Sequence, residues 1–281
     1  FYAVIPPFFP KFASDMKVRA KKRLGQHFLN DEGIARRIVD SLLEMDPRGA
    51  GCSVLEVGPG MGVLTKYLLQ EDGLDFRAVE IDEESVEYLI LNYPSIRSRL
   101  YEEDFLGMDL GKIFPGKLAV IGNFPYNISS QIFFKILEYK DNIPLAVGMI
   151  QKEVADRLAS PPGNKAYGIL SVLLQAWYDI EYLFSVEPGS FTPPPKVRSA
   201  VIRIRRNDRI SLGCDETIFK RVVKTCFNMR RKTIRNSIKP MLGDYTLTDT
   251  ASPLLDMRPE QLSVEMFVEL TKLLKTNTKA N

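Results

Sequence analysis

The chain has 281 residues and a net charge of +3, with 45% hydrophobic and 26% charged residues, as in soluble globular proteins with room for one large and one small domain. Its three cysteines, Cys52, Cys214 and Cys226, are far apart and form no Cys-x-x-Cys pair, which argues against a disulfide framework or a zinc site and favours a reducing cytoplasm. The single histidine, His27, excludes a histidine-rich metal cluster and disfavours a Ser-His-Asp triad.

The first 16 residues stand apart from the rest of the chain. They contain three prolines, no basic n-region and no uninterrupted apolar core, so they resemble neither a signal peptide nor a membrane span. Because Met16 followed by Lys17 is a more natural start, we interpret residues 1–16 as an upstream extension. We expect a cytoplasmic monomer with no membrane partner and no bound metal.

Residues from about 24 to 150, within a large domain predicted over 17–206, alternate helical and strand patterns, as βαβ units do. Strands are predicted over 54–57, 76–81, 118–121 and 145–150, with helices from about 32, 63 and 83. From 178 to 206 the pattern changes to strands without long helices between them. These patterns predict a mostly parallel, helix-covered sheet. Residues 207–281 predict a small all-α domain, with helices over 218–229, 233–242 and 264–274.

A glycine-rich turn follows the first strand of this sheet. Residues 55–62 read LEVGPGMG, and Gly58 and its neighbours let the backbone approach a ligand. Glu80 closes the second strand, where an acid can accept both hydrogen bonds of a ribose diol. NAD is the obvious competitor, but its fingerprint needs a glycine where Val63 stands. A ribose ligand without a pyrophosphate, such as S-adenosylmethionine, therefore fits better.

Two further segments are candidates for the same ligand. Asp104 is expected to end a third strand and to accept a hydrogen bond from an adenine amine, with a solvated acidic turn as the alternative. The segment Gly25–Leu29 precedes the first helix and could fold over the methionine end of the ligand. The alternative there is a His27 ring that is merely packed beside Phe28.

A stiff polar loop follows the strand at 118–121. Asn123, Pro125 and Tyr126 lie at a carboxyl end of the sheet, where ligands bind in open α/β folds. Pro125 restricts both itself and Phe124, so the Asn123 oxygen and a backbone carbonyl are held at a set separation. Two acceptors and the Tyr126 ring suit a planar base with an exocyclic amine. The alternative is an ordinary Asn/Pro turn.

The C-terminal part of the chain is basic. From position 201 onward there are 16 Lys and Arg against 9 Asp and Glu, a local net charge of +7. Such a segment on a near-neutral body indicates a polyanion partner. A solvated helical surface is the alternative.

Six blocks of the sequence stand in a familiar order and spacing. They are 25–29 (GQHFL), 55–62 (LEVGPGMG), 123–129 (NFPYNIS), 151–155 (QKEVA), 191–197 (FTPPPKV) and 227–236 (FNMRRKTIRN). Together, from about Arg23 to the C-terminus, they resemble the KsgA family of ribosomal RNA adenine dimethyltransferases. The resemblance implies a Rossmann-like seven-stranded domain that uses S-adenosylmethionine, followed by a helical domain. It also implies the substrate: two adjacent adenosines near the 3′ end of small-subunit 16S rRNA, each methylated twice at N6.

The resemblance assigns roles to individual residues. The implied cofactor contacts are His27, Leu29, Gly58, Glu80, Asp104 and Asn123. The implied catalytic residues are Asn123, Pro125, Tyr126 and Phe191, with Tyr126 and Phe191 as the rings that hold the flipped base. The expected phosphate contacts are Arg230, Arg231, Lys232 and Arg235, together with residues 17–23.

Two residues depart from the family pattern, and two other functions stay open. The family often has Asn at position 27 and usually has Leu at position 124, where this chain has His27 and Phe124. One alternative is the related large-subunit adenine methyltransferase of the antibiotic-resistance type. The other is a non-catalytic RNA-binding assembly or transcription factor on the same fold.

Overall fold

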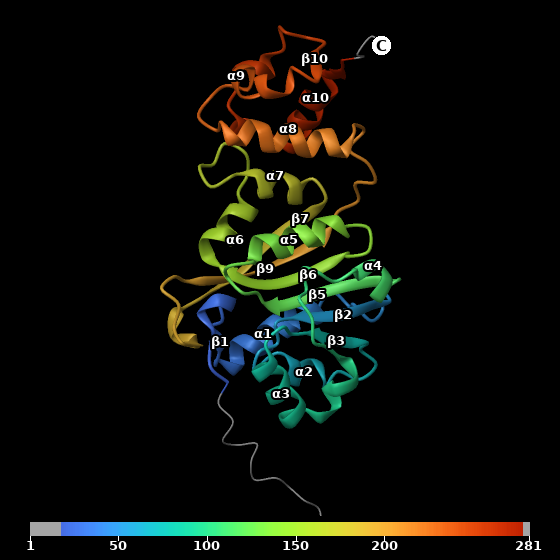
Figure 1. The fold of residues 1–281 in the computed structure, drawn as a ribbon, viewed down its shortest axis with the longest axis vertical. Helices are drawn as coiled ribbons and strands as arrows, with labels where there is room; N and C mark the ends of the chain where they lie inside the picture. The colour runs from blue at the N-terminus through green and yellow to red at the C-terminus, as the bar shows by residue number, and fades with distance from the viewer. Residues whose placement is uncertain (1–17, 278–281) are drawn as a thin grey trace, which may run out of the picture.

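The computed structural model describes residues 18–277, and the proposed extension at 1–16 lies outside them. Its centre is a seven-stranded sheet with the strand order β4-β3-β2-β5-β6-β9-β7 (Figure 1). The strands are β2 (Cys52–Val57), β3 (Phe76–Val79), β4 (Leu100–Tyr101), β5 (Lys117–Asn123), β6 (Leu145–Gln151), β7 (Tyr178–Val186) and β9 (Ser199–Arg206). The first five run parallel, and β9 is antiparallel to both β6 and β7.

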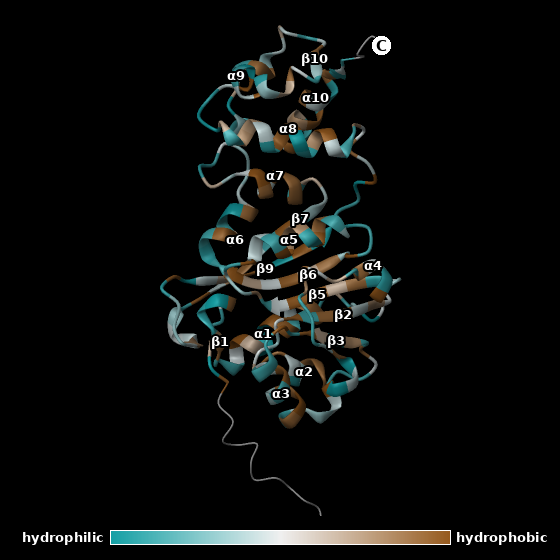
Figure 2. Cartoon of the chain, viewed as in Figure 1, coloured by the Kyte–Doolittle hydropathy of each residue, from teal (hydrophilic) through white to brown (hydrophobic). Residues whose placement is uncertain are grey.

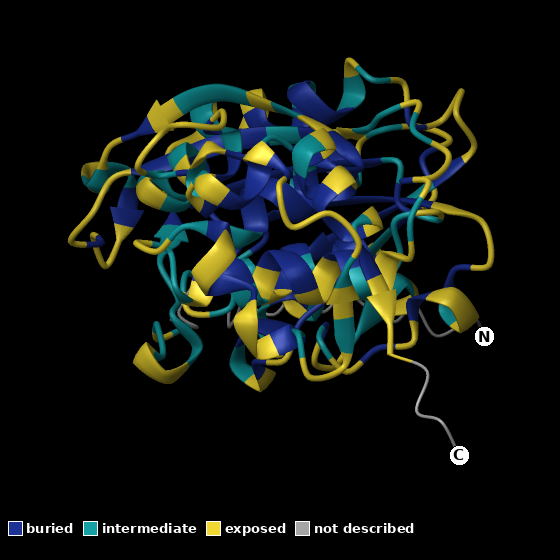
Figure 3. Ribbon diagram, turned by 90° about the horizontal axis from the view of Figure 1, so that it is seen from above, coloured by how far each residue is buried: buried dark blue, intermediate teal, exposed yellow. Residues whose placement is uncertain are grey.

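Helices cover both faces of the sheet and bury two apolar layers. One layer includes α1 (Glu32–Leu43), α2 (Thr65–Leu68) and α3 (Glu83–Asn92). The other includes α4 (Leu110–Ile113), α5 (Ser129–Glu138), α6 (Lys152–Ala159) and α7 (Ile169–Gln175). Apolar residues gather on the strands and polar ones on the outer helix faces (Figure 2). Viewed from above, buried residues fill the interior between exposed helix surfaces (Figure 3).

Local sequence explains where the first elements begin. Asp31 ends an extended stretch and its carboxylate accepts from the Ile34 amide, which caps α1. The strand β2 is almost wholly buried, in agreement with its run of apolar residues. The predicted strands at 54–57, 76–81, 118–121 and 145–150 are confirmed to within two residues at each end.

The order of the strands creates the crevice in which the site lies. From β2 the chain moves outward to β3 and β4, and it then returns to place β5 on the other side of β2. The carboxyl ends of β2 and β5 are therefore neighbours whose following loops diverge. In open α/β sheets this switch point is where ligands bind.

The C-terminal part stacks on α7 at the far end of the molecule from α1–α3 (Figure 1). It contains α8 (Glu216–Asn228), α9 (Ile234–Ser237) and α10 (Val264–Lys272), and its buried side chains share one apolar cluster with α5 and α7. It is mainly helical, as expected. It also holds a short antiparallel sheet of β10 (Tyr245–Leu247) and β11 (Leu274–Thr276), which the sequence pattern does not reveal.

The helix predicted over 233–242 is shorter in the structure. Only α9 is α-helical, and a 3-10 turn at Lys239–Met241 follows it. Pro240 lacks the amide that would continue the helical hydrogen bonding. In residues 18–277 no helix is both long and apolar enough to cross a membrane.

Candidate active site

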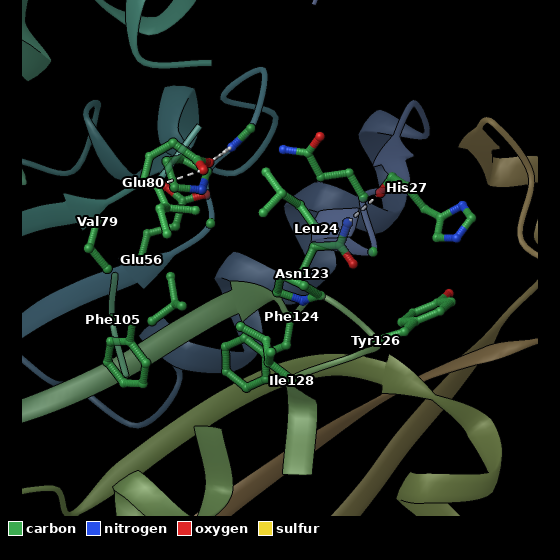
Figure 4. Close-up of a pocket in the computed structure, with 18 of the residues that line it drawn as sticks. Leu24, His27, Glu56, Val79, Glu80, Phe105, Asn123, Phe124, Tyr126 and Ile128 are labelled. Carbon is green, nitrogen blue, oxygen red and sulfur yellow. Dashed lines mark hydrogen bonds between the residues drawn. The ribbon is translucent and has the colours of Figure 1, made fainter. Parts of the chain in front are cut away.

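A cavity opens at the switch point between β2 and β5 (Figure 4). Its walls come from the glycine turn, the ends of β3 and β5, the turn after β4 and the segment 23–29. It brings together most of the predicted site residues: His27, Leu29, Gly58, Glu80, Asp104, Asn123, Pro125 and Tyr126. Phe191 is not among its lining residues.

The glycine turn gives the cavity its floor. Gly58 and Gly60 have φ of 69° and 55°, in the left-handed region that favours glycine. A Cβ on Gly58 would face the Pro125 ring at 3.8 Å, across the gap between the two strand ends. A Cβ on Gly60 would lie 3.0 Å from the Phe28 ring. Side chains at either position would narrow the crevice.

Glu80 is held by the backbone around it. Its carboxylate accepts from the amides of Gly60 (3.0 Å), Ile81 (2.9 Å) and Asp82 (3.0 Å), and the residue is only 5% exposed. Burial raises the pKa of Glu80, and these three hydrogen bonds act against that rise. A carboxylate has about four lone-pair sites, so a fixed carboxylate with acceptor capacity to spare faces the cavity.

A second buried acid, Glu56, lines the cavity and was not among the site residues predicted from the sequence. It lies on β2, is 1% exposed, and accepts a hydrogen bond from the Thr65 hydroxyl at 2.6 Å. Burial, with a smaller contribution from the nearby Glu80 charge, raises the pKa of Glu56 to about 8, against the lowering effect of the Thr65 hydrogen bond. The sequence could have revealed Glu56, because it is the one acid in a predicted strand of otherwise apolar residues.

The wall after β3 and β4 is partly apolar. Ile81 is 54% exposed, while Phe105 is 3% exposed, and both line the cavity. The expectation that Asp104 ends a strand is wrong, because β4 stops at Tyr101 and Asp104 lies in the following turn. There its Oδ1 accepts from the Leu106 amide at 2.9 Å.

Asn123 is the last residue of β5, and its amide has a defined orientation. Its Nδ2 donates to the His27 carbonyl at 2.9 Å (Figure 4). A carbonyl only accepts, so the nitrogen must face it, and Oδ1 is directed elsewhere. Oδ1 accepts no hydrogen bond from the part of the chain that the structure describes. The site thus presents a fixed, unused acceptor.

The next residues complete this end of the cavity. The Pro125 carbonyl accepts from the Ile128 amide at 3.2 Å, which leaves its second lone pair. The Tyr126 hydroxyl pairs with the Ser199 hydroxyl, and its ring lies 5.1 Å from that of His27. Burial raises the pKa of Tyr126, and the Ser199 hydrogen bond lowers it.

Phe124 is explained by two glycines beneath it. The residue is 1% exposed, and its ring meets Phe133 edge to face at 5.9 Å. A Cβ on Gly148, in the neighbouring strand β6, would lie 2.3 Å from that ring. A Cβ on Gly122 would lie 2.9 Å from it. The larger residue therefore fits because both neighbours lack side chains.

The segment before α1 is fastened to both sides of the cavity. Lys21 pairs with the buried Asp82, and the Gln26 side chain donates to Asp82 at 3.3 Å. On the other side, Asn127 donates to the Arg23 carbonyl at 3.1 Å. The predicted placement of residues 25–29 at the cavity therefore agrees with the structure.

Phe191 packs in the apolar layer of α1 and does not line the cavity. It lies in β8 (Phe191–Thr192), which pairs with β1 (Phe28–Leu29), so that Phe191 faces Leu29. It is 3% exposed and belongs to the apolar layer of α1. This geometry does not test its predicted role as a ring that holds the base, which stays a prediction. The His27 ring lies 5.1 Å from the Tyr126 ring, and its Nδ1 donates to the Pro193 carbonyl at 2.8 Å.

The four basic residues after α8 divide into two pairs. Arg230 donates to the Lys165 carbonyl at 2.6 Å, and Arg235 binds Asp256 at 2.8 Å. Arg230 thus ties the C-terminal part to the loop before α7, and Arg235 pairs within the C-terminal part. Their predicted role as phosphate contacts stays a prediction. Arg231 and Lys232 are exposed, and their side chains make no hydrogen bond or ion pair with the residues that the structure describes. They remain available to a polyanion.

Comparison with known proteins identifies the family. The model for ribosomal RNA adenine dimethylases matches residues 17–276. The chain belongs to this family. A ribosomal RNA small subunit methyltransferase A from Parabacteroides distasonis is 62% identical over 254 residues, which cover 90% of this chain and 93% of that relative.

Solved structures agree on the fold. A dimethyladenosine transferase from Plasmodium falciparum has a TM-score of 0.69 at 21% identity, over 88% of this chain and 99% of that one. The 23S rRNA methyltransferase ErmE has a TM-score of 0.63 at 25% identity, over 87% and 99%.

The predicted family, fold class and enzyme class, a ribosomal RNA adenine dimethyltransferase, are therefore confirmed. The roles of single residues stay predictions. Within the described residues, no group of three or more His, Cys, Asp or Glu side chains is arranged to hold a metal ion.

Proposed function

We propose that this family member transfers methyl groups from S-adenosylmethionine to N6 of two adjacent adenosines near the 3′ end of small-subunit rRNA. The observation that carries the proposal is the Asn123 amide, whose nitrogen is bound by the His27 carbonyl and whose oxygen is left as an acceptor. The family and the name of the 62% identical relative support the choice of rRNA. The site of action would be the cytoplasm, with the ribosomal particle as partner.

The residues on the floor of the cavity fit the methyl donor. The carboxylate of Glu80 is fixed by three backbone amides and keeps capacity for a ribose hydroxyl. Gly58 leaves open the gap toward Pro125, which a side chain would occupy. Ile81 and Phe105 offer apolar surface to the adenine, and the second Asp104 oxygen can accept from its amine. Leu29 and the backbone of His27 would close the methionine end.

The base end would activate the nucleophile. When bound, S-adenosylmethionine supplies a methyl group that its sulfonium already activates. Adenine N6 is a poor nucleophile because its lone pair is delocalised into the ring. The Asn123 oxygen and the Pro125 carbonyl would accept hydrogen bonds from the two N6–H groups, favour a pyramidal nitrogen and so localise the lone pair. The extra proton on the methylated nitrogen would then leave to water. This stabilisation is specific to the transition state. Tyr126 would hold the ring of the flipped base.

The exposed pair Arg231 and Lys232 would contact the phosphate backbone. Phosphate contacts supply affinity and position without reading sequence. Since Arg230 and Arg235 already bond within the chain, their removal should act on stability more than on RNA affinity.

The experiment offers labelled S-adenosylmethionine and the protein to unmethylated 30S and 50S subunits, after calorimetry of donor binding. We expect donor binding and label in the 30S rRNA alone. Label in the 50S rRNA would favour the large-subunit activity, for which the ErmE-like fold is the structural precedent. Absence of donor binding would favour a non-catalytic RNA-binding protein.

A further inference from the structure

Lys135 is a buried cation that the proposed chemistry does not use. It lies on α5, is 8% exposed, and its Nζ donates to the carbonyls of Leu106 (2.9 Å) and Met108 (2.5 Å). Among residues 18–277 no carboxylate forms an ion pair with it. The Tyr139 ring lies 5.5 Å from Nζ. A buried charge with two backbone acceptors and no counter-ion is costly, so its persistence calls for a reason.

The two carbonyls belong to the turn that follows β4. Within this turn the Gly107 amide donates to the Asp104 carbonyl at 2.9 Å, and the Met108 amide donates to the Phe105 carbonyl at 3.3 Å. Lys135 satisfies two further carbonyls of the turn, those of Leu106 and Met108. The turn has no strand or α-helix of its own through these residues, so one side chain from a distant element holds its shape.

This turn forms one wall of the cavity. Asp104, Phe105 and Leu106 line it beside Glu80. The helix that carries Lys135 begins two residues after Asn127, directly behind the loop of Asn123. Lys135 thus ties the helix behind the base end to the wall of the cofactor end.

We propose that Lys135 is a positioning residue that holds the Asp104–Leu106 wall and thereby sets the affinity for the adenine half of the methyl donor. The inference rests on the proposed function, because it assigns that wall to S-adenosylmethionine. It predicts an effect on donor affinity and none on the transfer step itself.

The test replaces Lys135 by Met, which keeps the length and removes the donors. Two buried carbonyls then lose their partner, and the wall loosens. We expect the Kd and KM for S-adenosylmethionine to rise about tenfold, with kcat at saturating donor within about twofold of wild type. Lys135→Arg keeps several N–H donors and should recover most of the affinity.

Lys140→Met is the matched control. Lys140 follows the same helix, has a 16% exposed side chain, and pairs with Asp141 and Glu216 away from the turn. This variant should bind the donor as wild type does. Thermal melting of all three variants without ligand shows whether each is folded. If Lys135→Met does not fold, the Lys135→Arg variant carries the test, and its Kd should lie within about threefold of wild type.

The outcomes separate the two proposals. If wild type fails to bind S-adenosylmethionine, the proposed function fails. If wild type binds and a folded Lys135→Met variant binds equally well, the positioning role is overturned. A loss of kcat with unchanged KM would also overturn it, as would equal losses in the Lys140→Met control.

Discussion

The two ends of the cavity are built in different ways. At the cofactor end, Glu56 and Glu80 are almost fully buried and their oxygens are already engaged by Thr65 and by backbone amides. At the base end, Asn123 is half-buried, and no residue that the structure describes donates to its amide oxygen. The acids of the cofactor end are therefore held by several donors of the protein itself, whereas Asn123 is held through its nitrogen alone. Donor binding and base activation therefore depend largely on separate residues, and substitutions can impair one without the other.

The largest expected effect comes from Asn123→Ala. Loss of one acceptor that acts only in the transition state should lower kcat by about 10²–10³-fold. Donor affinity should fall far less than kcat, since Glu80 and the glycine turn are untouched and only the Asn123 bond to the His27 carbonyl is lost. Single-turnover methylation and calorimetry measure the two quantities. A variant that retains dimethylation of undermethylated 30S particles would contradict the mechanism.

The next largest effect is expected from Gly148→Ala, because Gly148 makes room for Phe124 in the loop of Asn123. The new methyl group would meet the Phe124 ring at 2.3 Å, and overpacking of this kind costs about 1–3 kcal/mol. We expect a lower melting temperature and about a tenfold loss of activity at fixed donor concentration.

The matched variant for this prediction is the double mutant Gly148→Ala with Phe124→Leu. A shorter side chain at 124 vacates the space that the methyl group needs, so most of the activity should return. Equal impairment of the single and double variants would show that the two residues do not interlock.

A smaller effect is expected outside the cavity, from Arg231→Ala with Lys232→Ala. Two lost phosphate contacts should weaken binding to 30S particles and reduce the salt slope of log K by about 2. Calorimetric donor affinity should not change. Arg235→Ala is the control, because it breaks the Asp256 pair and should lower stability more than the salt slope. An unchanged slope in the double variant would exclude these two residues.

The smallest effect is a pH dependence of stability. With its pKa near 8, Glu56 keeps its proton in the native state, whereas the unfolded chain releases it above its ordinary pKa of 4.5. The native state then binds more protons, so this group lowers stability progressively as pH rises from about 4.5 to about 8. Glu56→Gln should match wild type near pH 5 and gain a few degrees in Tm at pH 8.

The exposed Glu102, changed to Gln, serves as the control for this pH series. Its melting temperature should follow that of wild type at every pH. If Glu56→Gln also ran parallel to wild type, Glu56 would not be protonated in the folded protein.

Sequence reasoning located what is local and missed what depends on distant pairing. The glycine turn, Glu80 and Asn123 follow directly from strands that end in polar residues, so their common edge was predictable. The pairing of Phe191 with Leu29, 162 positions earlier, was not predictable, because β8 is a strand of only two residues. Short pairings of this kind have no periodicity to reveal them.

The same limit applies to charges. Arg235 reads as a free cation in the sequence, yet Asp256 lies against it in the fold. Glu80 was predicted as an acceptor, but its three backbone donors were not predictable from spacing alone. Phe124 became intelligible only with Gly148, which belongs to a neighbouring strand 24 residues later.

The nucleoside that the wild-type enzyme makes is the most direct test of whether Asn123 activates adenine N6. After exhaustive reaction with unmethylated 30S particles, the rRNA is digested and analysed by mass spectrometry with positional mapping. The family and the Asn123 acceptor together predict N6,N6-dimethyladenosine at two adjacent positions near the 3′ end. Methylation at a ring nitrogen or on another base would contradict the role assigned to Asn123, and a single methyl group at N6 would contradict the proposed dimethylation.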